Sequence, residues 1–409
     1  MRNIELMQFT ENKSSFRTHW QLRNIALHCT EAGEGQAFFV SSVSNEEDAV
    51  AAAKASYSMI ADALHDRRME VVHERIFGSM SKEAAVMAAR REKLQKSGIP
   101  ADGPVTYIDG KPPWGEGLAG IIIRAVSSDI ADDVWTIMDG ENPCGRGWRR
   151  NGITSLLLQN IQGQAGTRPG QVRQMFERAE GILCRNGATY KDVARTWLYL
   201  SEILGWYPDF NKARSEKYGE FGIMPGPGDA RLLLPASSGI GADSPSGAAA
   251  SMDLLAVVEN GDMVSHVRKL TNRKQLDAFR YGAAFSRGAV IEEDDVSLIQ
   301  VSGTAAIDEH GISLYPGDIR AQINCTFDRI EALLWQEGAG LSDICAATVF
   351  VKLPEYADVF WEMARDRGLE AFPAVCVVAD VCREELLFEI DGEAVGRSRG
   401  CHSERSEAK

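Results

Sequence analysis

The feature that most constrains this chain is an order of elements that occurs three times along it. In the last third, short apolar runs alternate with longer amphipathic stretches. Runs of this length predict strands, and apolar residues at helical spacing predict helices. The order is therefore β-α-β-α-β-β, carried by residues 298–304, 318–336, 346–352, 356–367, 375–381 and 386–390.

The same order appears in the other two thirds. In the middle third the expected strands and helices cover residues 155–159, 171–186, 194–200, 208–221, 232–237 and 250–258. In the first third, a weaker copy, they cover residues 37–42, 47–64, 71–78, 82–97, 104–108 and 119–126. The closing strands recur about 130 residues apart, which is the size of a small domain. A chain of 409 residues is also longer than one hydrophobic core usually supports.

These repeats predict three α+β domains at residues 1–130, 143–258 and 273–395. The connecting segments 127–142 and 259–272 are expected to be linkers. The polar and basic tail 396–409 has no periodicity, so it is expected to be disordered.

Charge and composition exclude several kinds of partner. The net charge of −14 opposes binding to a phosphate backbone, so no nucleic acid is expected. No run of 18 or more apolar residues and no signal-peptide pattern occurs, which predicts a cytoplasmic protein without a membrane partner. The seven histidines and eight cysteines show no metal-ligand spacing, so neither a metal site nor a cofactor is expected.

Several short motifs resemble those of one family. They are Ala284–Arg287, Val301–Thr304, Gly317–Gln322 and Phe388–Asp391 in the last unit, and Arg195–Leu200 and Pro235–Gly241 in the middle unit. These stretches resemble the Rid superfamily (YjgF-type, L-PSP endoribonuclease-like), and the tandem arrangement is similar to its fused, chorismatase-like branch.

The resemblance implies a chorismate mutase-like fold and a pseudo-trimer within one chain. Rid proteins are homotrimers with a small-molecule cleft at each subunit interface. Three fused copies therefore imply a monomer or a small homo-oligomer, in which each cleft is free to diverge. The expected ligand is a small carboxylated metabolite.

One candidate binding surface follows from strand alternation in the middle unit. Residues 194, 196, 198 and 200 suit the face that packs on helices, while Arg195, Trp197 and Tyr199 share the opposite face. A guanidinium beside two aromatic rings suits a planar anion. Alternatively, Arg195 pairs with an acid of a neighbouring unit, because Glu74 stands at the equivalent place in the first unit.

The resemblance also assigns roles in the last unit. Glu389 stands where the family has a glutamate that positions water or delivers a proton; in an apolar cleft its pKa would rise and it would act as a general acid. The alternative is an exposed strand carboxylate. Leu255 and Ile123 stand at about the same place in the other units, so one cleft alone would carry an acid.

The resemblance also implies which residues of the last unit surround this glutamate and bind the substrate. Phe285 would stack on the ligand or serve as ordinary core, and Arg287 or Arg383 would hold its carboxylate. Cys376, like Cys382, is either a nucleophile or a core cysteine. Ser286, which follows Phe285, completes the set. The expected substrate-binding residues of the last unit are Phe285, Ser286, Arg287, Cys376 and Arg383.

One departure from the family pattern bears on the activity. Active deaminases of the family carry an arginine after the Pro373-Ala374 position, whereas this chain has Val375 there, and Ser237 and Val105 in the other units. The ordinary enamine/imine deaminase is therefore disfavoured. We expect a hydrolase or lyase of chorismatase-like chemistry, driven by proton transfer rather than by a metal; the alternatives are the deaminase and a non-catalytic binding or interaction scaffold.

Three further segments are expected to be turns or loops. Gly239–Asp243 follows an apolar run without a helical pattern after it, which predicts a turn between two strands. The segments Pro112–Trp114 and Cys144–Trp148 are expected to be loops packed by their tryptophans.

Overall fold

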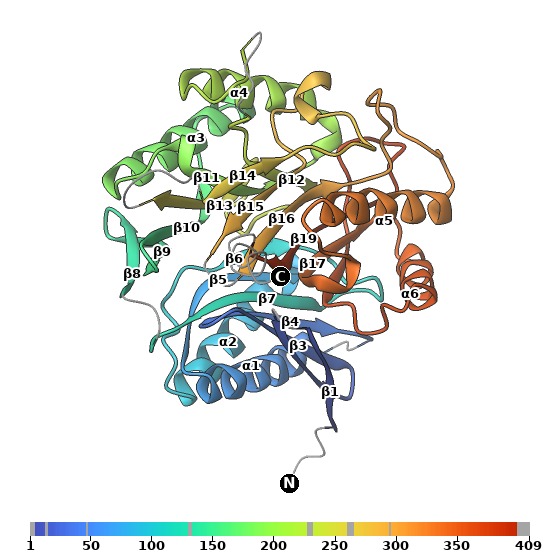
Figure 1. Ribbon diagram of the computed structural model, residues 1–409. Helices are drawn as coiled ribbons and strands as arrows, with labels where there is room; N and C mark the ends of the chain where they lie inside the picture. Colours follow the sequence, from blue (N-terminus) through green and yellow to red (C-terminus); the bar gives the residue numbers. More distant parts are fainter. Residues whose placement is uncertain are drawn as a thin grey trace, which may run out of the picture.

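The chain folds into three sheets, and each sheet is covered on one side by two α-helices (Figure 1). This arrangement, seen in a computed structural model, confirms the three tandem α+β units expected from the repeats. The first sheet has seven strands and the other two have six each. The structure describes residues 5–12, 15–45, 48–129, 133–226, 232–259, 266–293 and 296–398.

In the first unit the strand order is β1-β2-β3-β4-β7-β5-β6. The side chain of Asp48 caps its first helix by accepting hydrogen bonds from the backbone of Val50 and Ala51. The elements are β1 (Glu5–Asn12), β2 (Ser15–Leu22), β3 (Ile25–Ala32), β4 (Gln36–Val43), α1 (Ala49–Asp66), β5 (Met69–Gly78), α2 (Glu83–Lys96), β6 (Thr106–Asp109) and β7 (Leu118–Ser127).

In the middle unit the order is β12-β11-β13-β10-β9-β8. Thr167 caps its first helix, and a proline lies in the first turn, where no backbone N–H is needed. The elements are β8 (Asp133–Asp139), β9 (Asn142–Arg150), β10 (Ile153–Gln162), α3 (Arg168–Arg185), β11 (Val193–Leu200), α4 (Tyr207–Glu220), β12 (Ala236–Gly241) and β13 (Ala250–Glu259).

In the last unit the order is β14-β15-β16-β19-β17-β18. Asp318 caps its long helix through the backbone N–H of Ala321. The elements are β14 (Val267–Leu270), β15 (Gly288–Glu292), β16 (Val296–Thr304), α5 (Ile319–Trp335), β17 (Ile344–Val351), α6 (Tyr356–Asp366), β18 (Ala374–Val378) and β19 (Phe388–Arg397).

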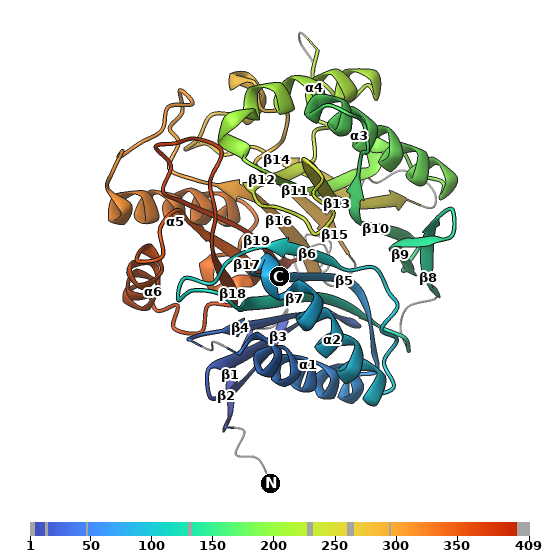
Figure 2. The same ribbon diagram turned by 180° about the vertical axis from the view of Figure 1, so that it is seen from behind.

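The helices lie on the outside and the three sheets face one another at the centre (Figures 1 and 2). Each unit has its own apolar core between its sheet and its helices. A fourth apolar cluster belongs to no single unit, because Phe38, Trp197 and Leu298 come from three different sheets. Burial of this shared surface holds the units together.

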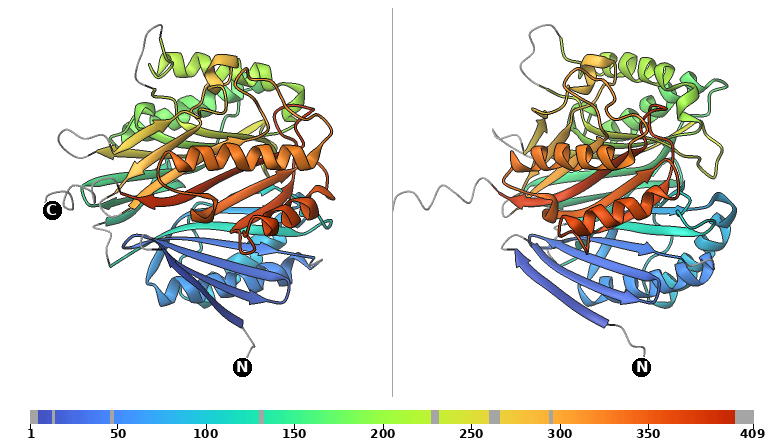
Figure 3. Two further views of the ribbon diagram at one scale, coloured as in Figure 1. Left: turned by 45° about the vertical axis from the view of Figure 1, so that its right-hand side comes forward. Right: turned by 90° about the vertical axis from the view of Figure 1, so that its right-hand side faces the viewer.

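Backbone hydrogen bonds also join the units in a ring. The ends of β6, β12 and β18 and the residues after them meet. Each of these three segments donates one backbone hydrogen bond to another and accepts one from the third. Asp109 N donates to Asp243 O (3.0 Å), Gly241 N to Asp380 O (2.9 Å), and Val378 N to Lys111 O (2.9 Å). Figure 3 shows the first unit seated beneath the other two.

Several segments expected to be irregular are strands. The two linkers contain β8 and β14, and the tail begins as the end of β19, which runs to Arg397; residues 399–409 lie outside the described part of the chain. Cys144–Trp148 lies in β9 rather than in a loop, because Gly145 and Gly147 serve close packing. A Cβ on Gly145 would lie 2.3 Å from Leu157 O, and one on Gly147 would lie 2.3 Å from the Trp135 ring.

The predicted turn at Gly239–Asp243 is also wrong at its start. Residues 239–241 form the end of β12. Gly241 is needed there because two neighbours approach closely: a Cβ would lie 2.8 Å from Ile203 of the same unit and 3.1 Å from Asp380 of the last unit.

Candidate active site

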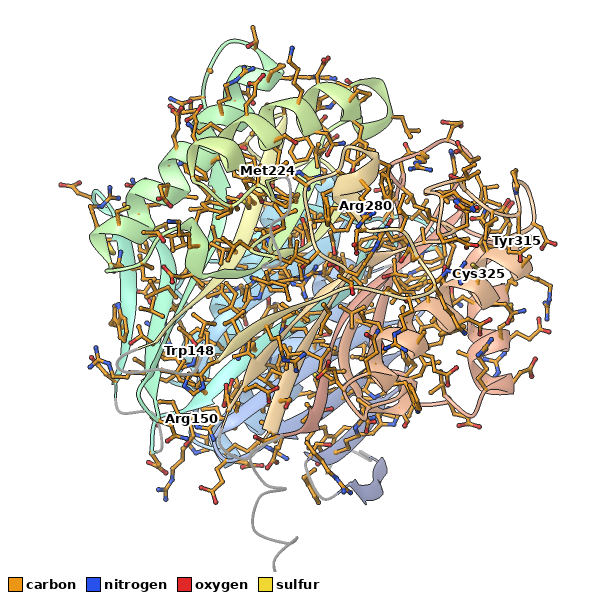
Figure 4. All side chains as sticks on the ribbon, turned by 45° about the horizontal axis from the view of Figure 1, so that its top comes forward. Trp148, Arg150, Met224, Arg280, Tyr315 and Cys325 are labelled. Atoms are coloured by element: carbon orange, nitrogen blue, oxygen red, sulfur yellow. The ribbon has the colours of Figure 1, made fainter. Side chains whose placement is uncertain are left out.

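A cleft of about 440 Å³ lies between the middle and last units. The middle unit contributes α4 and β12. The last unit contributes the 275–287 segment, the end of β16, the 382–383 corner and β19. Arg280, labelled in Figure 4, lies in the short 278–281 turn of that segment, at the boundary between the two units.

Glu389 is the ionisable group at the base of the cleft. It lies on β19 and its side chain is 5% exposed. Burial, with a further contribution from the negative charge of Asp391, raises the pKa of Glu389 to about 8, although Arg195 and Arg287 oppose the shift. The carboxyl group therefore keeps its proton at neutral pH. A protonated carboxyl in a cleft is a usable general acid.

A glycine makes room for this carboxyl group. A Cβ on Gly303, in β16, would lie 2.1 Å from Glu389 Oε1 and 3.4 Å from the Cα of Ser238. No side chain other than hydrogen therefore fits between the carboxyl group and the two adjacent strands. Gly303, within Ser302-Gly303-Thr304 of β16, therefore leaves the space that the carboxyl group of Glu389 on β19 occupies.

Three arginines border the cleft, and within the described residues none of them forms an ion pair with a carboxylate. Arg287 is buried and is held by two acceptors: its Nε donates to Leu276 O (2.9 Å) and its Nη2 to Tyr281 Oη (2.8 Å). Arg383 is held at the rim by Gly311 O (2.9 Å).

The third arginine, Arg214, comes from the middle unit. It lies on α4 and is 1% exposed, and its Nε has no hydrogen-bond partner within the described residues. Its guanidinium lies 5.6 Å from the ring centre of Phe285, and Arg287 lies 5.4 Å from the same ring. Phe285 thus lies close to two guanidiniums that have no carboxylate partner among the described residues, and the cleft is suited to a carboxylated ligand.

The cysteine of the cleft is a poor nucleophile as it stands. Burial and the nearby Glu389 raise the pKa of Cys382 to about 12, so its sulfur stays a thiol at neutral pH. Cys376, expected at the site, lies instead in the core of the last unit, where burial raises its pKa further. It does not line the cleft.

Four of the expected residues meet in the cleft: Phe285, Arg287, Arg383 and Glu389. Ser286 does not line it, because its side chain donates to Gly288 O (2.9 Å) while its backbone N donates to Pro235 O (2.9 Å) across the seam between the units. Arg214 was missed from the sequence. Its signal was a cation on the apolar face of α4, among Phe210, Ala213 and Tyr218.

Arg195, Trp197 and Tyr199 lie elsewhere, buried between the three sheets. Arg195 Nη2 donates to Asp391 Oδ2 (3.0 Å) and to Ser238 Oγ (2.6 Å), so its partner is an acid of the neighbouring unit. A ligand is not required to balance its charge.

Glu74 is not an interunit partner of this kind. It is bound within the first unit by Arg90 (2.6 Å) and by the Tyr57 hydroxyl (2.6 Å).

The strand register corrects two of the expected equivalences between units. In each unit the strand that pairs with the closing strand (β5, β11 or β17) contains a bulge. The residue four positions after the first paired residue beyond the bulge is Phe77, Tyr199 or Phe350. Their partners are Gly120, Ser251 and Glu389. The positions equivalent to Glu389 are therefore Gly120 and Ser251, not Ile123 and Leu255.

The same count applies to the missing arginine. Val375 pairs with Thr348, whose equivalents Trp197 and Arg75 pair with Ser238 and Thr106. The corrected equivalents of Val375 are thus Ser238 and Thr106, rather than Ser237 and Val105, and none of the three is arginine.

The described residues contain neither a candidate metal site nor a candidate membrane-spanning helix. No cluster of three or more His, Cys, Asp or Glu side chains there has an arrangement that could hold a metal ion. Among the helices of the described segments, none combines the length and the apolar character needed to cross a membrane.

Comparison with known proteins gives three similarities. Residues 277–395 match the family described as Endoribonuclease L-PSP. Two proteins of Streptomyces hygroscopicus, a chorismatase and a 3-hydroxybenzoate synthase, are each 27% identical to this chain over 226 and 233 residues. These matches cover 50% of this chain and 61% and 63% of the two relatives, less than two thirds of their length.

The fold itself has a solved counterpart. A crystal structure of a chorismatase superimposes with a TM-score of 0.60 at 19% sequence identity. The superposition covers 80% of this chain and 93% of the other. At this identity the likeness concerns the fold.

Proposed function

The chain belongs to the Rid superfamily, in the tandem form related to its chorismatase-like branch, and on that premise we propose that it is an enzyme acting on a small carboxylated metabolite of the chorismate type. The observation that carries the proposal is the pairing of a protonated carboxyl, Glu389, with three arginines that lack carboxylate partners in the described residues. The reaction would be a hydrolysis or elimination that begins with proton transfer.

The cleft suits such a substrate in size and charge. A volume of about 440 Å³ falls in the range of small-molecule sites. Arg287 and Arg214 both lie near the ring of Phe285, so a carboxylate bound by these guanidiniums would place an unsaturated ring or chain against the aromatic face. Arg383 at the rim would hold a second carboxylate.

The proposed chemistry uses the proton that Glu389 retains. Glu389 would donate it to an unsaturated carbon or to a leaving oxygen of the substrate, and the cation that forms would be captured by water or lose a proton. The carboxylate left behind would be stabilised by Arg287 and Arg195, whose charges already favour it. It would then recover a proton from the attacking water or from the product.

The test is to incubate the purified chain with chorismate and to follow the loss of substrate and the release of pyruvate by chromatography. Turnover that requires Glu389 would support the proposal. Saturable binding of chorismate without turnover would instead favour a non-catalytic binding protein. If chorismate is neither bound nor turned over, the proposed substrate class is refuted.

The deaminase alternative is tested with 2-iminobutyrate. We expect weak activity, because none of the three equivalent positions Val375, Ser238 and Thr106 carries the arginine with which the family's deaminases hold the substrate carboxylate. Loss of such a charged hydrogen bond typically costs about 1.5–3 kcal/mol, or about a tenfold to more than a hundredfold loss in binding. Hydrolysis at the rate of ordinary Rid deaminases would reverse this assignment.

A further inference from the structure

A second cavity, of about 370 Å³, lies at the seam between the first and last units. One wall is the β2–β3 hairpin of the first unit, and the other consists of the 341–343 turn and the 368–373 loop of the last unit. It shares no residue with the cleft that contains Glu389. Its volume is within the usual range of small-molecule sites.

Arg17 is the cation of this cavity. It is half-buried, and its Nη2 donates to Ile344 O (3.0 Å). Within the described residues it has no ion pair with a carboxylate. At the seam between the middle and last units, a lysine, Lys269, makes the matching contact with Val193 O. An arginine is therefore not needed for the contact itself, and its other N–H groups remain for a ligand.

Two histidines stand beside this cation. His19 and His28 are cross-strand neighbours whose rings stack with centres 4.3 Å apart. Burial lowers the pKa of both imidazoles, so both are neutral at neutral pH. His19 Nε2 is buried and has no hydrogen-bond partner in the described part of the chain. Buried polar atoms are nearly always paired, so this nitrogen is available for a hydrogen bond to a ligand in the cavity.

The remaining walls limit the class of ligand. Leu369 and Phe372 are buried apolar side chains that line the cavity. Asp343 and Glu370 also line it, and their charges disfavour a ligand with several negative charges. One guanidinium with an apolar wall and two nearby acids suits a ligand with a single carboxylate better than a phosphate ester.

We propose that the cavity at the first–last seam is a second ligand site, which binds a small monocarboxylate through Arg17 and His19 and packs its apolar part on Leu369 and Phe372. The site is independent of the chemistry at Glu389. Because its two walls belong to different units, an occupied site would also link the first unit to the last.

The experiment observes the histidines directly. The chain contains seven histidines, so protein labelled with ¹³C at histidine Cε1 gives a resolvable spectrum. Titration with 3-phenylpropionate should shift the His19 and His28 signals in a saturable way, with assignments from His19→Ala and His28→Ala. Arg17→Gln should weaken this binding at least tenfold. Arg287→Gln, which changes the other cleft, should leave it unchanged.

A second variant covers the case in which Arg17→Gln alters folding. Ala371 is an exposed residue of the cavity wall, so Ala371→Trp should fill the cavity and abolish the shifts while Arg17 remains. Inorganic phosphate at the same concentration should produce no shifts of the His19 and His28 signals. Absence of saturable shifts in the wild type, shifts that survive in Arg17→Gln, or tighter binding of phosphate would each overturn the proposal.

Discussion

A carboxyl group acts as a general acid only if it still carries its proton at the working pH, and for Glu389 this is decided by burial and by the charges around it. Asp391 lies two positions further along β19 and adds negative charge, while Arg195 and Arg287 oppose it. Burial is the largest effect, and it follows from the seam between two units. The identity of Glu389 was available from the sequence, but its protonation state depends on burial that only the assembled units provide.

The first prediction concerns pH and the Glu389→Gln variant. General acid catalysis typically contributes 10²–10⁴-fold, so turnover should fall by about that range. Because the acid form is the active one, wild-type turnover should decline as the pH rises through about 8. Glu362→Gln, in an exposed ion pair with Arg320, is the control. Unchanged turnover in Glu389→Gln would remove Glu389 from the mechanism.

The same group makes a separate prediction for stability. Its folded pKa of about 8 lies above the ordinary value of 4.5, so the folded state binds more protons than the unfolded state between these pH values. Its contribution to stability is complete below pH 4.5 and is lost as the pH rises through 8. The free energy of unfolding of the wild type should therefore fall relative to that of Glu389→Gln over this window. Urea titrations at pH 5, 7 and 9 measure it, and parallel curves would show that Glu389 is not buried as described.

Gly303 provides a geometric test of the same site. In Gly303→Ala the new methyl group would overlap Glu389 Oε1, so the carboxyl group must move and turnover should fall at least tenfold. Gly219→Ala is the matched control, because nothing lies within 4 Å of its Cβ position on α4 and alanine favours a helix by about 0.5–1 kcal/mol. Full activity in Gly303→Ala would show that the position of the carboxyl group is not critical.

At the scale of elements, periodic patterns were reliable where one face is apolar and a cap marks the end. The long helices α3 and α5 begin within a few residues of the expected positions because Thr167 and Asp318 cap them. Strands β8, β9 and β14 were missed for different reasons: polar residues and glycines dominate β9, β14 has only four residues, two of them charged, and β8 is a short run between two aspartates. β8 pairs with β9, β9 with β10, and β14 with β15, and this pairing depends on tertiary contacts that a local pattern does not contain.

The candidate site shows the same division. Alternation in β11 correctly placed Arg195, Trp197 and Tyr199 on one face, but the sequence could not tell whether that face meets a ligand or another unit. Ala194 was assigned to the helix-facing side, yet it belongs to the central cluster, because a bulge between Val193 and Arg195 shifts the alternation.

The ion pair between Arg195 of β11 and Asp391 of β19, which crosses the seam, gives the fourth prediction. Arg195→Met would leave Asp391 buried without its cation, and breaking a buried ion pair in this way typically costs about 3–5 kcal/mol. The free energy of unfolding, measured by urea titration, should fall by about that amount. Arg173→Met, in an exposed pair with Glu216, should cost no more than about 1 kcal/mol. If Arg195→Met lowers the free energy of unfolding by no more than about 1 kcal/mol, water replaces Arg195 as the partner of Asp391.

At the scale of the whole molecule, fusion of three units explains why one seam alone keeps the acid. Gly120 and Ser251 occupy the positions equivalent to Glu389. At the first–last seam, Val375 fills the space next to Gly120, where an added Cβ would lie 2.6 Å from it. At the first–middle seam, Asp253 is engaged by His73 (2.9 Å) and Thr106 (2.7 Å). Separate identical subunits could not diverge in this way.

The last prediction concerns the assembly in solution. The ring of backbone hydrogen bonds at 109–111, 241–243 and 378–380 closes within one chain, and the central apolar cluster is completed by three sheets of that chain. No further copy is needed to bury these surfaces, so we expect a compact monomer or a small multiple of it. Sedimentation equilibrium should give a mass of 44.8 kDa or a low multiple. An obligate trimer of chains, with no smaller species on dilution, would show that the three internal seams do not replace the subunit interfaces of single-unit relatives.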